Sequence, residues 1–178
     1  MRRGIFQGIA LTAAVCSAVM STTGASDRLT EKQLSLAGIK TLCVSVQGVT
    51  EEVKKAGLSA EQIKSDVEEK LKEIGIKAVS EEEAEKLAGK PSIYVNVSVH
   101  KRERVAAFMF NIDVGVLQEA KLVRDPKIEI MSITWIKGRT GECPSRGLVK
   151  AMEETVNYLM EEFCKDYRKA NPVTDADN

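Results

Sequence analysis

The sequence predicts a single α+β domain: a mixed sheet of about five strands, helices mainly on one face, and a long C-terminal helix. A capped amphipathic helix separates two strand-like segments between residues 39 and 79, which predicts a βαβ unit. Residues 91–137 then form three strand-like segments joined by short polar turns, typical of an antiparallel meander. An apolar stripe of helical period follows up to Lys169.

The first 25 residues have the pattern of a secretory signal peptide. Arg2 and Arg3 precede an apolar run, and small residues end at Ala25, where we expect cleavage. The run has about 16 residues, fewer than the ~20 that a membrane-spanning helix needs. A lipid anchor at Cys16 is the less favoured alternative, because bulky Val15 stands where lipoprotein signals carry a small residue. We therefore expect a periplasmic or secreted protein.

Cleavage would shorten the chain from 178 residues by 25, to 153, a length that suits one domain with a sizeable core. We expect a polar tether over residues 26–37, the domain over residues 38–172 and a disordered tail over residues 173–178. The leader holds two of the 26 basic residues and no acidic one, so 24 basic residues remain against 26 acidic residues. This balance argues against a nucleic-acid partner.

The first strand is expected over Ile39–Val49, which is rich in β-branched residues, and a loop over Thr50–Leu58. Ser59 with Gln62 has the spacing of a capping box at a helix start, and Gly75 is the expected C-terminal stop. Apolar residues recur between them at helical spacing: Ile63, Val67, Leu71 and Ile74.

A short strand over residues 76–79 completes the βαβ unit, with its two strands parallel. Ser80 with Glu83 predicts a second capping box, and Gly89 ends the short helix that follows. The strand that begins at Pro91 alternates cleanly, which predicts an antiparallel sheet with one covered face. The expected inward residues are Ile93, Val95, Val97 and Val99.

The fourth segment, Val105–Val123, is too long for a small domain. It has 19 residues, and at ~3.3 Å per residue it would span about 60 Å. It must bend, bulge or project beyond the sheet, and Gly115 is the expected bulge or kink.

The fifth strand, Ile128–Lys137, is apolar on both faces, so it is either sandwiched between layers or holds a partner on one side. We expect a glycine-rich loop over residues 138–144 and then a helix over residues 145–169. The apolar stripe of that helix comprises Val149, Met152, Val156, Leu159, Met160, Phe163 and Tyr167.

Three cysteines would remain after cleavage, and we expect buried free thiols. A continuous helix from residue 145 would hold Cys143 and Cys164 about 30 Å apart, beyond the ~7 Å between bridged Cα atoms. A bridge between Cys43 and Cys164 stays open.

The sequence contains no recognisable catalytic motif and no recognisable metal-ligand motif. His100 is the only histidine, and it has no identifiable base or nucleophile partner. The cysteine and histidine spacings match no zinc ligand set, and no phosphate-binding glycine motif is present. We expect a protein that is not an enzyme and that has no cofactor and no metal.

Two polar stretches are candidate binding sites. The loop 47–57, with Glu51 and Glu52, follows a parallel strand at the end where α/β sheets bind ligands, although a plain connection is the alternative. Lys101, Arg102 and Arg104 form a basic cluster that predicts a weak contact with an anionic surface. A charged turn that discourages strand aggregation is the alternative there.

The order of segments IKTLCVSVQGV, GLSAEQIKSDVEEKLKEIGIKAV, PSIYVNVSV, DVGVLQEAKLVRDPKIEI and FCKDYRKANP resembles a family of small exported bacterial proteins of unknown function. The resemblance covers most of residues 37–172 and implies no activity and no site. At the level of fold, the architecture is similar to envelope domains such as the amino-terminal domain of TolB and lipoprotein activators of cell-wall synthases, and function does not follow from that.

The leading functional hypothesis is an exported, non-enzymatic adaptor that docks an envelope protein through the long fourth–fifth hairpin, with Trp135 among its contacts. The alternative is a periplasmic domain that binds a small ligand at the loop 47–57. The sequence does not decide the oligomeric state.

Overall fold

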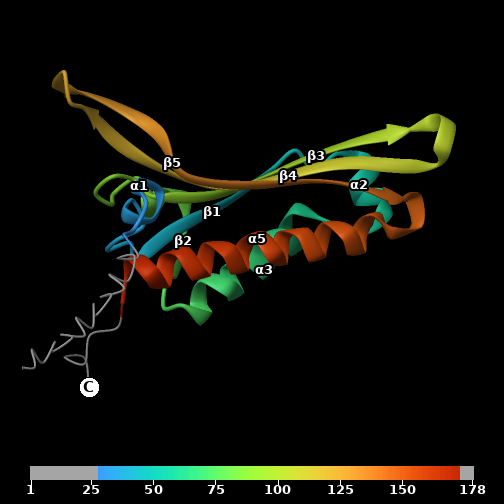
Figure 1. The fold of residues 1–178 in the computed structure, drawn as a ribbon, viewed down its shortest axis with the longest axis horizontal. Helices are drawn as coiled ribbons and strands as arrows, with labels where there is room; N and C mark the ends of the chain where they lie inside the picture. The colour runs from blue at the N-terminus through green and yellow to red at the C-terminus, as the bar shows by residue number, and fades with distance from the viewer. Residues whose placement is uncertain (1–27, 173–178) are drawn as a thin grey trace, which may run out of the picture.

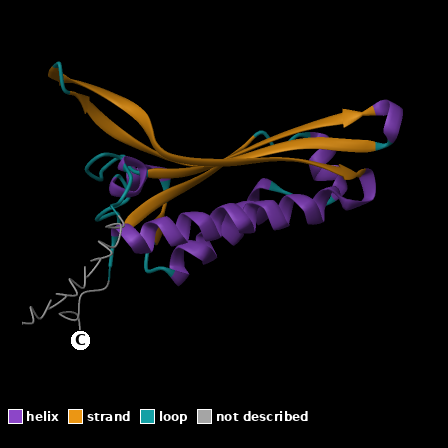
Figure 2. Ribbon diagram, in the orientation of Figure 1, coloured by secondary structure: helices purple, strands orange, loops and turns teal. Residues whose placement is uncertain are grey.

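The computed structural model describes residues 28–172, which form one five-stranded mixed sheet in the order β2-β1-β3-β4-β5. β1 is parallel to both β2 and β3, and β3, β4 and β5 form an antiparallel meander. The two longest helices lie on one side of this sheet (Figure 1; Figure 2). The predicted α+β fold with a long C-terminal helix is therefore confirmed. The predicted signal peptide, Cys16 and the tail lie outside the described residues.

The strands differ greatly in length. β2 is the shortest and β5 the longest: β1 Thr41–Gln47, β2 Lys77–Val79, β3 Ser92–Arg102, β4 Ala107–Leu122 and β5 Asp125–Pro144. β1 pairs with β2 over three residues and with β3 over five, so the predicted parallel βαβ unit is confirmed.

The helical layer consists mainly of α3 (Ala60–Glu73) and α5 (Leu148–Ala170), which cover one face of the sheet. Each contributes its apolar stripe to one continuous core, because residues spaced three or four apart share a helix face. The core side chains with under 2% exposure include Leu42, Ile63, Leu71, Ile93, Ile112, Trp135, Met152, Leu159 and Phe163.

The short helices are α1 (Glu31–Leu34), α2 (Glu51–Ala56) and α4 (Glu81–Ala84), and the 3₁₀ turns are η1 (Glu103–Val105) and η2 (Ser145–Gly147). The side chains of Ser80 and Glu83 form both halves of the predicted capping box at α4. At α3 only one half forms: Gln62 N donates to Ser59 Oγ, whereas the Gln62 side chain donates to Asp66.

The segment predicted as a polar tether is folded over its described part. Gln33 N and the Gln33 side chain form both halves of a capping box with Thr30, and α1 follows. Leu36 is fully buried in the core, and Asn171 Nδ2 donates to its carbonyl oxygen. One fully buried leucine and these capping bonds are enough to hold a segment whose weak periodicity indicated no structure.

The stretch predicted as the loop 50–58 is helical as well. Glu51 and Glu52 occupy the first turn of α2, where carboxylates favour the helix dipole, and Gly57 ends it with φ 107°. Val53 is fully buried, which holds a helix this short in place.

β4 and β5 pair along their whole lengths, and the glycine-rich loop predicted over residues 138–144 is part of β5. The glycines there serve the packing, since a Cβ at Gly138 would lie 2.1 Å from Asp113 Oδ1 and one at Gly141 would lie 2.5 Å from Phe110 Cζ. Neighbouring side chains on β4 occupy this space, which is why a strand tolerates glycine here.

The predicted bulge at Gly115 is wrong. Val116 pairs with Trp135 but Leu117 pairs with Ile133, so Thr134 is the extra residue, on the opposite strand. Gly115 instead lies under the ring of Tyr94, whose Cε1 would be 2.5 Å from a Cβ at that position. The glycine accommodates an aromatic ring, and the bulge that bends the hairpin is one strand away.

Cys43, Cys143 and Cys164 are buried free thiols, as predicted. Burial raises the pKa of each thiol above its ordinary value. The bridge between Cys43 and Cys164 that the sequence left open is not formed.

Candidate interaction surface

A two-stranded ribbon extends beyond the body of the domain. β3 ends its pairing with β4 at Ser92 opposite Leu117, so β4 and β5 continue alone through residues 118–133, which we call the hairpin arm. From Leu117 to the turn at Val123 the arm spans about 20 Å at ~3.4 Å per residue. Figure 1 shows it projecting away from the helical layer. Of the three predicted outcomes for the long segment, to bend, to bulge or to project, the structure shows a projection, with a bulge on the opposite strand.

Both faces of the hairpin arm are apolar and exposed. Ile128 and Ile130 lie on one face of β5, and Met131 and Ile133 lie on the other, because successive side chains alternate along a strand. These four side chains remain 41–49% exposed, and Val123 at the turn is 98% exposed. A ribbon of two strands has no second layer to cover either face, so the apolar surface stays in solvent.

The base of the arm is fastened by α1. Gln118 Nε2 donates to the carbonyl oxygen of Ser35 at 3.0 Å and to Thr134 Oγ1 at 2.8 Å. Ser35 Oγ donates to the carbonyl oxygen of Thr134 at 3.2 Å. Glu119 N also donates to the carbonyl oxygen of Gly89. These bonds fix the direction in which the arm leaves the sheet.

Trp135 was predicted as a contact residue, and the structure places it in the core with 1% exposure. The extra residue at Thr134 shifts the alternation by one, so Trp135 lies on the helix-covered face opposite Val116. Its ring meets Phe163 edge to face at 5.3 Å, and its Nε1 donates to Asp166 Oδ2 at 3.1 Å. Trp135 therefore anchors the base of the arm from inside the core.

Asp166 joins the arm, α1 and α5. It accepts from Trp135 and, at 2.8 Å, from Gln33 Nε2, and Lys137 Nζ lies 3.4 Å from its Oδ2. Burial by itself would raise the pKa of this carboxyl, but the bonds from Gln33 and Trp135 and the charge of Lys137 together lower it. Asp166 is thus a buried carboxylate held in its ionised form.

Lys101, Arg102 and Arg104 lie exposed where β3 runs into η1, at the opposite end of the sheet from the arm (Figure 1). Arg102 Nη1 pairs with Glu142 Oε1 at 2.9 Å, and both side chains are half exposed. The structure does not bring this basic cluster to the hairpin arm, so the two surfaces are independent.

Glu51 and Glu52 are exposed on α2, where Glu51 pairs with Lys54 at 2.9 Å. Gln47 borders a hollow of about 410 Å³ beside β1, whose other polar lining includes Ser45, Lys64 and Glu81 and does not include Glu51 or Glu52.

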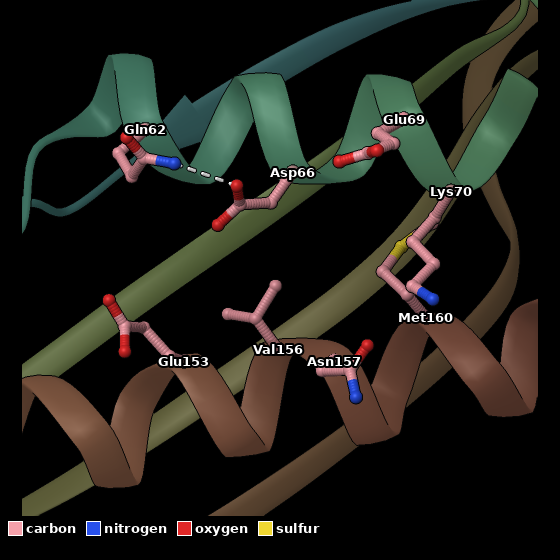
Figure 3. Close-up of a pocket in the computed structure, with 8 residues that line it drawn as sticks. All are labelled: Gln62, Asp66, Glu69, Lys70, Glu153, Val156, Asn157 and Met160. Atoms are coloured by element: carbon pink, nitrogen blue, oxygen red, sulfur yellow. Dashed lines mark hydrogen bonds between the residues drawn. The ribbon is translucent and has the colours of Figure 1, made fainter.

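A groove between α3 and α5 was not predicted. It has a volume of about 430 Å³, and Val156 and Met160 line it together with three carboxylates (Figure 3). Its residues belong to two helices about 90 positions apart in sequence, so only the packing of the helices reveals it. The remaining lining residues are Gln62, Asp66, Glu69, Lys70, Glu153 and Asn157.

Within residues 28–172, no group of three or more histidine, cysteine, aspartate or glutamate side chains is arranged to hold a metal ion. No helix in this part of the chain is both long and apolar enough to cross a membrane.

Comparison with known proteins adds little to this description. No protein-family model matches the chain, and no curated protein matches it significantly in sequence. Among solved structures, the PelC dodecamer from Paraburkholderia phytofirmans aligns over 73% of this chain and 89% of its own, with 14% identity and a TM-score of 0.44. A TM-score this low carries no inference. The fold and surface define a single-domain α+β protein with an overhanging apolar hairpin.

Proposed function

We propose that this chain is a non-enzymatic, exported envelope protein that binds a protein partner through the hairpin arm. The observation that carries the proposal is a ribbon with exposed isoleucine and methionine side chains on both faces. Soluble monomers seldom leave such surface uncovered unless it has an interaction to make. Export is supported by the leader pattern of residues 1–25.

The arm offers enough apolar surface for a specific contact. Full burial of an isoleucine or methionine side chain contributes about 1.5–3 kcal/mol. Ile128, Ile130, Met131 and Ile133 have roughly half of that left to gain, so together they would contribute about 4 kcal/mol before the cost of association. The partner has to reach both faces, which favours a groove that receives the arm over a flat surface.

A four-site variant tests the proposal: Ile128→Ser, Ile130→Ser, Met131→Ser and Ile133→Ser. The matched control is Val105→Ser with Met109→Ser, which removes exposed apolar side chains at the far end of the sheet. Tagged proteins are expressed with the native leader, and co-purifying envelope proteins are quantified by mass spectrometry. We expect recovery of the partner to fall at least tenfold with the arm variant, about 1.4 kcal/mol or more, and to stay unchanged with the control.

Equal recovery with both variants would sink the proposal, provided that circular dichroism and thermal melting show both to be folded. The arm lies outside the core, so the four substitutions leave the buried contacts of the sheet intact.

A second candidate function rests on the hollow beside β1. Its mixed lining of Ser45, Gln47, Lys64 and Glu81 suits a small polar ligand. In a thermal-shift screen against envelope metabolites, a ligand should raise the unfolding midpoint of the wild type. This increase should disappear in Gln47→Ala and remain in the control Glu52→Ala. No shift with any compound would remove this candidate.

The basic cluster supports a weaker contact with an anionic surface. Lys101, Arg102 and Arg104 should bind anionic vesicles at low salt and release them at high salt, because exposed charges are screened. Sedimentation with vesicles measures this binding, and binding that does not change with salt concentration would refute the electrostatic contact.

A further inference from the structure

We propose that the partner of the hairpin arm is a second copy of this chain, which receives the arm's tip in the groove between α3 and α5. This inference rests on the proposed function, since it takes the arm to be a docking surface. The tip of the arm and the groove have complementary chemistry, and the same chain carries both surfaces.

The tip of the arm is apolar and cationic. Val123 projects from the turn with 98% exposure, Arg124 follows it directly, and Lys127 lies four positions after it on β5. Neither cation forms an ion pair within residues 28–172, whereas Lys121 is neutralised by Glu129 at 2.9 Å. Asp125 accepts from the backbone N–H of Lys127. The tip therefore presents two unpaired cations beside an exposed aliphatic side chain.

The groove has the opposite chemistry. Val156 and Met160, both nearly fully buried, form its apolar part, and Asp66, Glu69 and Glu153 bring carboxylates from both helices. Glu153 comes from α5, opposite the α3 carboxylates, as Figure 3 shows. The exposed valine of the tip would pack on the apolar floor of the groove, and the nearby cations would face its carboxylates.

One cation belongs to the groove itself. Lys70 lies at the end next to Met160 (Figure 3), and its Nζ lies 3.4 Å from Glu73 Oε2. Its charge is thus partly satisfied outside the groove, and three carboxylates against one ammonium leave the groove acidic.

The dimensions agree. From Gln62 to Lys70 the α3 wall is eight residues long, about 12 Å at 1.5 Å per residue. Two paired strands lie about 4.8 Å apart, so a hairpin tip with its side chains is about 10 Å wide. A volume of about 430 Å³ is ample for the Val123 side chain and the aliphatic part of one neighbouring arginine or lysine.

The contact has to be intermolecular and head to tail. The arm projects away from the helical layer, so the tip of one copy does not reach its own groove (Figure 1). Tip and groove are different surfaces, so each copy would offer one free tip and one free groove. Such heterologous contacts build rings or chains of copies and not an isolated twofold dimer.

Charge reversal on each surface separately tests the contact. The tip variant is Arg124→Glu with Lys127→Glu, and the groove variant is Glu69→Lys with Glu153→Lys, all at exposed positions. The control is Lys101→Glu with Arg104→Glu, the same reversal on the basic cluster. Association is measured by analytical ultracentrifugation at about 100 μM protein and about 50 mM salt.

We expect the wild type and the control to associate with rising concentration, and more weakly at high salt. Each reversal alone should weaken self-association at least about tenfold, because like charges then face each other. An equimolar mixture of the two variants should associate again, since an acidic tip then meets a basic groove and the unaltered tip meets the unaltered groove.

A wild type that stays monomeric at this concentration, or a mixture that stays monomeric, overturns the inference. The proposed function can still stand in that case: the four-site arm variant would lose an envelope protein of different mass that the wild type recovers. If the wild type is monomeric and the arm variant also recovers every partner, both proposals fall.

Discussion

Replacing Asp166 by asparagine should loosen the joint that holds the hairpin arm and α1 to α5. Asparagine keeps the size of the side chain, but it can accept from only one of Gln33 and Trp135, because these donors bind different carboxylate oxygens of Asp166 and asparagine has a single acceptor oxygen. It loses the charge that strengthens both hydrogen bonds and pairs with Lys137. The substitution therefore removes one hydrogen bond together with the negative charge.

The expected cost follows from the contacts. The hydrogen bond that asparagine can keep becomes neutral and loses about 1 kcal/mol, and the bond that it cannot keep loses about 2 kcal/mol. The Lys137 pair adds about 0.5 kcal/mol, discounted because Lys137 is 35% exposed. Relief of carboxylate burial offsets about 1 kcal/mol. The net loss is about 2.5 kcal/mol, which corresponds to a drop of about 8 °C in Tm.

The cost should depend on pH with a definite sign. The folded-state pKa of Asp166 is lowered, so its charged contacts contribute fully above the unfolded carboxyl pKa of about 3.9 and are lost as pH falls through the lower folded value. The difference between the wild type and Asp166→Asn should therefore be full at pH 7 and shrink as pH drops below about 4.

Urea unfolding at pH 7 and at about pH 3 measures this difference. Asp66→Asn is the matched control: Asp66 accepts one hydrogen bond on the partly exposed surface of α3, and its loss should cost under about 0.5 kcal/mol. A variant at position 166 as stable as the wild type at pH 7, or a difference that grows in acid, would refute the reasoning.

Three other substitutions or reactions probe the fold. Leu36→Ala should lower the unfolding free energy by about 2–5 kcal/mol in urea, whereas a segment acting as a tether would give no change. Gly115→Ala should cost about 1–3 kcal/mol because its Cβ meets the Tyr94 ring, and the cost should mostly vanish in a Tyr94→Ala background; a cost unaffected by that background would count against the packing described. Cys43, Cys143 and Cys164 should react with a disulfide reagent only after unfolding, because they are buried and their thiol pKa values are raised. Fast labelling of these cysteines in the native protein would contradict this.

Local patterns predicted most of the fold. The alternation from Pro91 predicted the antiparallel pairing, and the Ser80–Glu83 spacing predicted a complete capping box. The helical stripe up to Tyr167 predicted the buried face of α5. These features depend on residues within a few positions of one another, so the sequence alone contains the information.

Features that depend on distant contacts were missed. α2 is six residues long and is held by the burial of Val53, which no local pattern shows. Gly138 belongs to a strand because Asp113, on the neighbouring strand, fills the space of a side chain. Without the register of β4 against β5, glycine indicates a loop.

The candidate surface was predicted in part. Segment length predicted a bend, a bulge or a projection. Apolar residues on both faces predicted a strand that is either sandwiched between layers or free to hold a partner, and the structure leaves Ile130 and Met131 exposed. The exception was Trp135, because one extra residue at Thr134 moves every following side chain to the other face. The α3–α5 groove needed the packing of two distant helices and left no signal in the sequence.

Site-specific photo-cross-linking tests most directly whether the hairpin arm is the docking surface. A benzophenone amino acid replaces Met131 on the arm or, as a matched control, Met109 on β4, which are 49% and 42% exposed. Irradiation of cells that express each protein with its native leader should give a discrete protein adduct at position 131 and none at position 109. An adduct at position 109 with none at position 131, or no adduct at either, would contradict the account.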